Sequence, residues 1–349
     1  MRKMAQRLNS AGASQSIHII AYEQAEGARF CLLSVVPSFT NLKWTFFPIH
    51  VILTMEVRDM SDYVLMTDSS CDLPAGLAAE MELCVLPLSI YIEDKQYFNY
   101  LDGREISFKD IYAKLRTKCP AKTSAVNMEA FLEPMEEILK TGRDVLYIGF
   151  SSGLSGTYNA GAAAAQELSA KYPERKVLAV DSLCASLGQG LLLYHAWQRK
   201  KEGMGIETLK QWVLYNRLKL CHWFTIDDLM FLKRGGRISG ATAVVGSMLS
   251  IKPVMHVDDE GRLIKVSTAR GRKASIRALA DEAGKRGTDL QNQIIFISHG
   301  DCEDDAKYLA DLMRERYHVK DVLINYVGPV IGAHSGPGTV AMFFMGTER

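Results

Sequence analysis

The chain has 349 residues, of which 48% are hydrophobic, and its 41 basic and 40 acidic residues give a formal net charge of +1 at pH 7. This length and composition are typical of a folded chain of two domains and exclude a largely disordered one. The balanced charge, with no Lys/Arg cluster interleaved with aromatic residues, gives no support for nucleic-acid binding. Seven scattered cysteines without a C-x-x-C pair favour reduced thiols and a cytoplasmic protein over disulfides or structural zinc.

Residues 1–60 show no clear secondary-structure pattern. Their apolar residues are interrupted by prolines and polar residues, so no run reaches the ~20 residues that span a bilayer. The basic start is followed by polar residues 9–16 and is therefore unlike a secretory signal. We expect a poorly patterned extension, and one hypothesis is that translation begins at Met55 or Met60, so that this segment is not part of the native protein.

Strands and helices alternate from Tyr63 onward, which predicts a mainly parallel sheet flanked by helices over residues 61–217. Pro134 predicts a kink in one of these helices, or a later start. The predicted strands are 63–67, 145–149 and 177–180, and residues 85–92 and 95–100 are predicted to form a hairpin. The predicted helices are 127–140, 160–170 and 191–200. A further helix is expected to begin at Ser107, with Asp110 as the capping partner.

The pattern changes beyond about Leu218. Several extended segments now follow one another, and a turn at 258–261 joins two of them. We therefore predict a C-terminal α/β domain with a mixed sheet over residues 218–349. Its predicted strands are 221–226, 252–257, 262–267 and 294–298, and its predicted helices are 274–286 and 302–317.

The loop at residues 150–158 carries the strongest chemical signal, because Ser151, Ser152, Ser155 and Thr157 lie with two glycines between a strand and an Ala-rich helix. Such a junction brings unpaired backbone N–H groups, a helix dipole and hydroxyls together and so favours anion binding. A carboxylate or a phosphate would fit equally well. Helix capping by serine is the plain alternative.

A second alternative is an esterase. Residues 149–153 form a G-x-S-x-G string at a strand-to-helix junction, with Ser151 as the nucleophile. Asp181 and then His299 or His334 follow in the order of an α/β-hydrolase triad.

Three further residues are candidates for the same site. Loops that follow successive parallel strands meet at one edge of the sheet, so the Thr123 hydroxyl is expected to meet Ser155, although it could simply satisfy local backbone. Arg237 lies in a basic, glycine-rich loop that suits bidentate capture of a carboxylate or phosphate, or is plain surface charge. His334 lies among glycines and prolines and is the best titratable candidate. No histidine pair has metal-ligand spacing on one helix, and no metal is expected.

Six segments of the chain, namely 67–74, 122–124, 151–158, 181–190, 235–239 and 332–338, carry distinctive patterns. Together, and in this order, they resemble the DegV family of bacterial fatty-acid-binding proteins, which includes the binding subunits of fatty acid kinase. The resemblance runs from about Val64 to Gly346. Residues 125–127 depart from the family's usual Gln-Pro-Ser, and residues 1–60 have no counterpart.

The resemblance implies a two-domain α/β fold that encloses one long-chain fatty acid between the domains, with the acyl chain in an apolar tunnel. By motif, Thr123 and Ser155 would bind the carboxylate, with Ser152 as a further contributor. His334 would lie beside the head group and Arg237 near the rim, where a kinase subunit would phosphorylate the carboxyl.

We therefore expect a cytoplasmic, non-catalytic carrier without cofactor or metal that presents a fatty acid to a kinase subunit for acyl phosphate formation. Burial of about sixteen carbons at ~0.8 kcal/mol per CH₂ gives on the order of 12 kcal/mol before binding costs, so the tail can dominate affinity. No nucleic acid and no integral membrane segment are expected, and transient contact with a membrane surface stays open. Acyl chain length, oligomeric state and the identity of the kinase also stay open.

Overall fold

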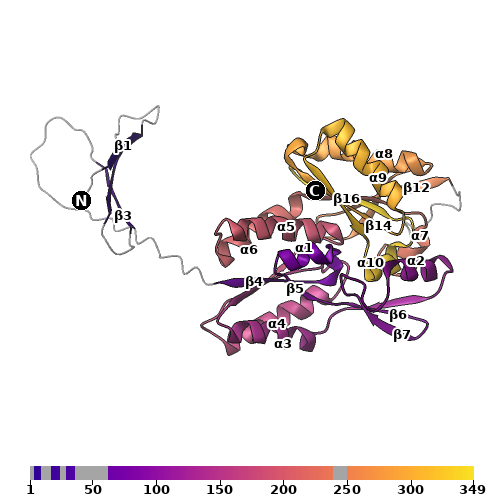
Figure 1. The fold of residues 1–349 in the computed structure, drawn as a ribbon, viewed down its shortest axis with the longest axis horizontal. Coiled ribbons are helices and arrows are strands. Elements are labelled where there is room, and N and C mark those ends of the chain that lie inside the picture. Colours follow the sequence, from indigo (N-terminus) through magenta and orange to yellow (C-terminus); the bar gives the residue numbers. More distant parts are fainter. Residues whose placement is uncertain (1–3, 9–16, 24–28, 36–61, 239–249) are drawn as a thin grey trace, which may run out of the picture. The chain divides into compact units, whose positions relative to one another are not determined.

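The computed structural model describes residues 4–8, 17–23, 29–35, 62–238 and 250–349 (Figure 1). Residues 1–59 and 60–349 form two separate compact units. The first unit contains an antiparallel sheet of three strands, which the sequence pattern does not indicate. That this segment is an extension outside the native protein stays a prediction. Met55 and Met60 lie outside the described residues. The strands are β1 (Met4–Leu8), β2 (Ile17–Glu23) and β3 (Arg29–Val35).

The second unit begins with a four-stranded parallel sheet in the order β10-β9-β4-β5, as the alternating pattern predicts. Its two central strands are buried along their whole length, because helices cover both faces (Figure 1). The strands are β4 (Tyr63–Asp68), β5 (Cys84–Leu86), β9 (Asp144–Gly149) and β10 (Val177–Asp181), and the helices are α1 (Ala75–Glu80), α3 (Met128–Lys140), α4 (Thr157–Lys171), α5 (Leu187–Lys201) and α6 (Ile206–Asn216).

A small antiparallel sheet, in the order β7-β6-β8, carries the next part of the site. The predicted hairpin is confirmed, but the predicted strand 85–92 is divided between two sheets at Pro87, which has no N–H for a ladder. Ser107 caps α2 as predicted, since its hydroxyl accepts the Asp110 N–H at 3.1 Å. The elements are β6 (Ser89–Ile92), β7 (Lys95–Phe98), α2 (Phe108–Arg116) and β8 (Ala121–Ser124).

Pro134 does not delay the start of α3. The helix begins at Met128 because the Asn127 side chain accepts the Ala130 N–H at 3.0 Å, and it continues past the proline. Buried Phe131, on the turn before the proline, and Met135, next to it, hold the helix against the core.

The C-terminal sheet has the order β13-β12-β11-β16-β14-β15 and is mixed, because only the β14–β15 pair is parallel. The predicted domain boundary between residues 217 and 218 lies, in the sequence, between the strands of the parallel sheet and those of the C-terminal sheet. Because residues 60–349 form one compact unit, this boundary stays a prediction. The strands are β11 (Leu220–Thr225), β12 (Ile251–Val257), β13 (Leu263–Arg270), β14 (Ile294–His299), β15 (Asp321–Tyr326) and β16 (Val340–Met345), and the helices are α7 (Leu229–Arg234), α8 (Arg272–Arg286), α9 (Glu303–Tyr317) and α10 (Pro329–Ser335).

Helix α5 contacts strands of the C-terminal sheet as well as the loop that follows β4. Residues 187–193, its first two turns, are all buried, as expected for a helix end enclosed on more than one side. The N-terminal end of α5 therefore lies in the interior, close to the candidate site.

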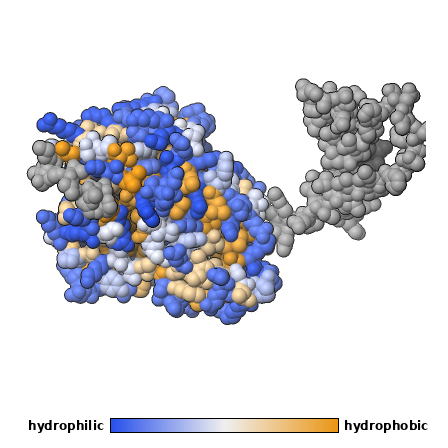
Figure 2. Space-filling view, turned by 180° about the vertical axis from the view of Figure 1, so that it is seen from behind, coloured by the Kyte–Doolittle hydropathy of each residue, from blue (hydrophilic) through white to orange (hydrophobic). Residues whose placement is uncertain are grey.

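Hydrophilic residues surround smaller hydrophobic patches on the face of the second unit that Figure 2 shows. Scattered apolar residues on a surface are normal for a folded domain. Within the described part of the chain, no helix has both the length and the apolar character needed to cross a membrane.

Candidate functional site

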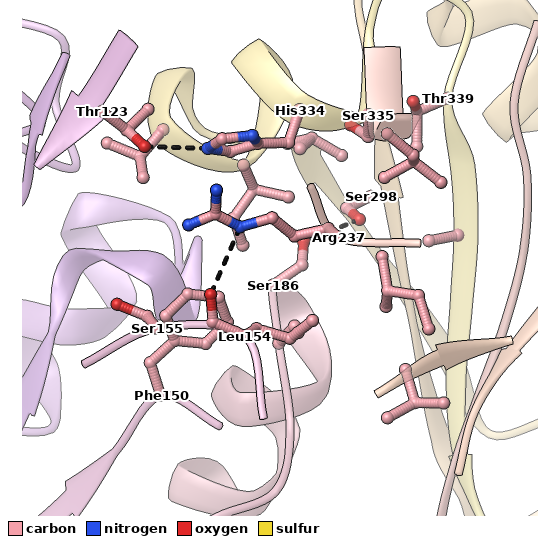
Figure 3. A pocket seen from close by; sticks show the side chains of 18 of the residues that line it. Thr123, Phe150, Leu154, Ser155, Ser186, Arg237, Ser298, His334, Ser335 and Thr339 are labelled. Carbon is pink, nitrogen blue, oxygen red and sulfur yellow. Dashed lines mark hydrogen bonds between the residues drawn. The ribbon is translucent and has the colours of Figure 1, made fainter. Parts of the chain in front are cut away.

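One cavity is lined by residues from both halves of the second unit (Figure 3). It contains about 950 Å³ of space free of protein atoms, a figure that includes open solvent at its mouth. Most of its wall is apolar, so it suits a hydrocarbon better than a sugar or a nucleotide. The apolar wall includes Phe150, Leu154, Phe224, Leu232, Val330 and Phe343.

Thr123 and His334 are brought together at the cavity from distant parts of the chain. Thr123 lies on β8, opposite Ile90, and its Oγ1 is 2.8 Å from Nε2 of His334 (Figure 3). His334 lies on the short helix α10, not in the loop that the surrounding glycines suggest. Both side chains line the cavity.

The imidazole of His334 is held neutral. Burial, followed by the nearby charge of Arg237, lowers its pKa to about 4. Nδ1 is buried without a hydrogen-bond partner, and Gly235 lies so close that a Cβ there would be 2.2 Å from this atom. His334 therefore offers one donor or acceptor at Nε2, depending on the tautomer, and no charge at neutral pH.

Ser155 lines the same cavity from the loop between β9 and α4. Its Oγ accepts the Thr157 N–H at 3.2 Å and lies 2.9 Å from the Thr157 hydroxyl. Gly156, not a serine, is the N-cap residue of α4, and the Ser155 hydroxyl, which also borders the cavity, accepts the first backbone N–H of the helix. Thr123 and Ser155 line one cavity. The topological reason for expecting this is wrong, because Thr123 lies on a strand of the small antiparallel sheet and not in a loop at the edge of the parallel sheet.

Arg237 crosses the cavity with its guanidinium beside the loop that carries Ser155 (Figure 3). Its Nε donates to the Leu154 carbonyl at 3.3 Å, and Nη1 donates to the Gly235 carbonyl. Burial lowers its pKa, although a guanidinium stays charged in proteins. Arg237 also lines a more open hollow with Gly153, Asp258 and Arg262, so it borders both the cavity and this outer hollow. Ser239 and Gly240 of the predicted loop lie outside the described residues.

Ser152 is placed differently from the expectation. Its side chain is exposed and does not line the cavity. Its backbone N–H donates to the Asp181 carboxylate at 3.2 Å, which turns this part of the loop away from the site. We therefore no longer count Ser152 among the candidate ligands.

The esterase alternative is wrong in its geometry. Ser151 is fully buried, its hydroxyl donates to the Gly261 carbonyl at 2.8 Å, and it does not line the cavity. His299 instead accepts the Cys302 N–H, and His334 bonds Thr123. Asp181 accepts backbone N–H groups of its own neighbourhood, so the described residues assemble no Ser–His–Asp triad.

Sequence reasoning missed a second polar group in the wall, made of Ser186, Ser298, Ser335 and Thr339. Ser186, the N-cap residue of α5, lies in the matching segment 181–190, and Ser335 lies in the matching segment 332–338. Ser298 ends a predicted strand, and nothing in the sequence indicates that these residues share a wall. Ser186 donates to buried Asp72 at 2.6 Å, and burial raises the pKa of this carboxyl to about 7. No cluster of three or more metal-ligating side chains occurs among the residues that the structure describes.

Comparisons with known proteins agree on one family. Residues 63–347 match a family model described as "Uncharacterised protein, DegV family". A DegV domain-containing protein of Clostridium perfringens is 47% identical over 290 residues, which are 83% of this chain and 99% of that protein.

Solved structures of DegV proteins share the fold. A Thermus thermophilus structure, described as fatty acid binding of a DegV family protein, is 31% identical with a TM-score of 0.73, over 82% of this chain and 99% of that one. A structure from Bacillus subtilis, described as DegV, a fatty acid binding protein, is 26% identical with a TM-score of 0.69, over 82% of this chain and 100% of that one.

Proposed function

The chain belongs to the DegV family, and on that premise we propose that it binds one long-chain fatty acid, with the acyl chain in the cavity and the carboxylate at Thr123 and Ser155. The observation that carries the proposal is a single apolar cavity bordered by these two hydroxyls and by the neutral imidazole of His334. An amphiphile with a long hydrocarbon and one small polar end matches this arrangement. The relatives described as fatty-acid-binding proteins support it.

The two ends of the ligand have different roles. The tail supplies affinity, because each buried CH₂ contributes ~0.8 kcal/mol. The head group is oriented by hydroxyl donors, and the charge of Arg237 offsets part of the cost of removing a carboxylate from water. His334 can donate from Nε2 to the Thr123 oxygen, which frees the Thr123 proton for the carboxylate.

We expect protein purified from cells to retain one fatty acid, which native mass spectrometry would detect.

Thr123→Val is expected to weaken fatty-acid binding about tenfold or more. Valine keeps the branched shape on β8 and removes the hydroxyl that bonds the charged head group. The free protein should lose at most about 1 kcal/mol of unfolding free energy, as is usual for one hydrogen bond. Affinity is measured by displacement of a fluorescent fatty acid, and unfolding by denaturant titration.

Thr117→Val is the matched control, because Thr117 is exposed at the end of α2 and outside the cavity. It should leave affinity unchanged. Ser155→Ala is less informative, since it also removes the acceptor of the Thr157 N–H at the start of α4 and so lowers the stability of the free protein by about 1 kcal/mol. A purified protein that consistently holds no lipid, or holds a phosphate ligand instead, would contradict the proposal.

We further propose that the bound fatty acid is presented to a kinase subunit. The γ-phosphoryl group of ATP would pass to a carboxylate oxygen, giving an acyl phosphate and ADP. Arg237 supports this because it lines both the cavity and the outer hollow, and an arginine there can bind a phosphate oxygen as it approaches the carboxylate.

Arg237→Ala is expected to lower acyl phosphate formation by more than it lowers retention of the fatty acid. Loaded protein is incubated with ATP and an extract of the source cells, and the acyl phosphate is trapped with hydroxylamine as its hydroxamate. Arg262→Ala, on the same hollow but outside the cavity lining, is the control for a general loss of surface charge. Equal losses of product and of retained lipid would refute the role of Arg237.

A further inference from the structure

A strip of four hydroxyls interrupts the apolar wall of the cavity. It consists of Ser186, Ser298, Ser335 and Thr339, and we call it the hydroxyl strip (Figure 3). Its members come from three segments of the chain, since Ser335, the last residue of α10, and Thr339 both lie at the connection between α10 and β16. All four are buried, with exposed fractions of 5%, 0%, 6% and 3%. A hydrocarbon chain would leave such groups in contact with CH₂ alone, which is unfavourable for any hydroxyl without a partner.

The hydrogen bonds of the strip are incomplete. Ser186 donates to Asp72, and Ser298 lies 3.0 Å from the Ser186 oxygen, so Ser298 donates to Ser186 and its own lone pairs remain. Thr339 donates to the Gly336 carbonyl at 2.8 Å. The Ser335 hydroxyl has no partner at all, although it is buried. One free donor and one free acceptor thus border the same cavity.

The charges around the strip restrict what it can bind. Asp72 lies directly behind Ser186, so a second carboxylate in the ligand would be buried beside a carboxyl group. Among the described lining residues, Arg237 carries the one permanent positive charge, and its Nε is held at Leu154. A neutral group that both donates and accepts a hydrogen bond is therefore the chemistry that fits.

We propose that the hydroxyl strip binds a hydroxyl group carried along the acyl chain, so that the cavity is specific for a hydroxylated long-chain fatty acid. The ligand hydroxyl accepts from Ser335 and donates to Ser298, which satisfies both free groups. This inference rests on the proposed function and adds a substrate class to it. Ser335 and Ser298 become residues that determine specificity, separate from the head-group residues.

The test is a position scan of the ligand on the full-length protein. Octadecanoic acid and its monohydroxylated forms, with the hydroxyl at successive carbons, compete with a fluorescent fatty acid. We expect one position, or two adjacent ones, to bind at least as tightly as octadecanoic acid. The other hydroxylated acids should bind about tenfold or more weakly than it, because their hydroxyl is buried without a partner.

Two variants assign the preference to the strip. Ser335→Ala and Ser298→Ala should each weaken binding of the preferred hydroxy acid by about fivefold or more. Octadecanoic acid should bind each variant at least as tightly as before, because no hydroxyl is then buried against its CH₂ groups. Ser267→Ala, at an exposed serine of β13 outside the cavity, should change neither affinity.

Three outcomes are distinguishable. A preference for one hydroxyl position that both variants remove supports the proposal. Weaker binding of every hydroxylated acid, as expected if an ordered water already satisfies the strip, overturns it, and so does a preference that survives both variants. If octadecanoic acid and all its derivatives fail to bind, the proposed function itself fails.

Discussion

Ala341→Phe is expected to reduce fatty-acid affinity more than a hundredfold while the free protein stays folded. Ala341 lies on β16, between Phe224 of β11 and Ser298 of β14, and lines the cavity. A phenyl ring at this position occupies the volume that the acyl chain needs. Because each excluded CH₂ removes ~0.8 kcal/mol, displacement of four or more of them accounts for a loss of this size.

The ring should cost the free protein little, since it enters a cavity that already exists instead of a closely packed core. Native mass spectrometry gives the retained lipid, and the melting temperature gives the stability. The series Ala341→Val, Ala341→Leu and Ala341→Phe serves as an internal control, because a graded side chain should progressively restrict binding to shorter acids. Unchanged binding of long acids by a stable Ala341→Phe protein would place the tail elsewhere.

The parallel sheet of the second unit could be predicted because its strands are short apolar runs. Residues 144–149 are buried along the whole strand, and helices precede and follow it. Local pattern is sufficient in such a case, because the buried face, the strand length and the alternation all agree.

The short helices that carry the site could not be predicted in the same way. Helix α10 contains glycine and proline, which normally indicate a loop. Gly332 is needed there because the Tyr112 hydroxyl passes against it on its way to the Val327 carbonyl, and a Cβ would lie 2.5 Å from that oxygen. The helix is therefore stabilised by a contact with α2 that no local pattern contains.

The same reasoning explains which site residues were found. Thr123, Ser155 and His334 lie in recognisable segments, but the bond between Thr123 and His334 joins residues 211 positions apart. Ser152 and Ser155 are both serines of the same loop, so the sequence does not distinguish which of them faces the cavity. The hydrogen bond from the Ser152 N–H to the Asp181 carboxylate, which the sequence does not reveal, directs Ser152 away from it. The hydroxyl strip is assembled by the tertiary fold from three distant segments, which contain Ser186, Ser298 and residues 335–339.

Arg349→Ala is expected to lower the unfolding free energy by about 3 kcal/mol, because it removes several charge-assisted hydrogen bonds at once and leaves buried acceptors without donors. The guanidinium is buried and donates to four backbone carbonyls, which join the loop before α5, the start of β11 and the turn after β12. The acceptors are Leu183 at 2.8 Å, Arg217 at 2.6 Å, Leu220 at 3.1 Å and Asp258 at 2.9 Å.

Denaturant titration of the ligand-free protein measures this loss. Glu348→Ala, at the exposed neighbouring residue, is the control and should change the unfolding free energy by no more than about 0.5 kcal/mol. Arg349→Lys should give an unfolding free energy between those of the two variants, since one ammonium cannot reach four carbonyls in different directions.

The turn that Arg349 holds at Asp258 also presents the Gly261 carbonyl to Ser151, at the base of the loop that carries Ser155. Arg349→Ala should therefore also weaken fatty-acid binding under conditions in which the variant is still folded. A large loss of stability with unchanged affinity would show that the Ser155 loop is held without this contact.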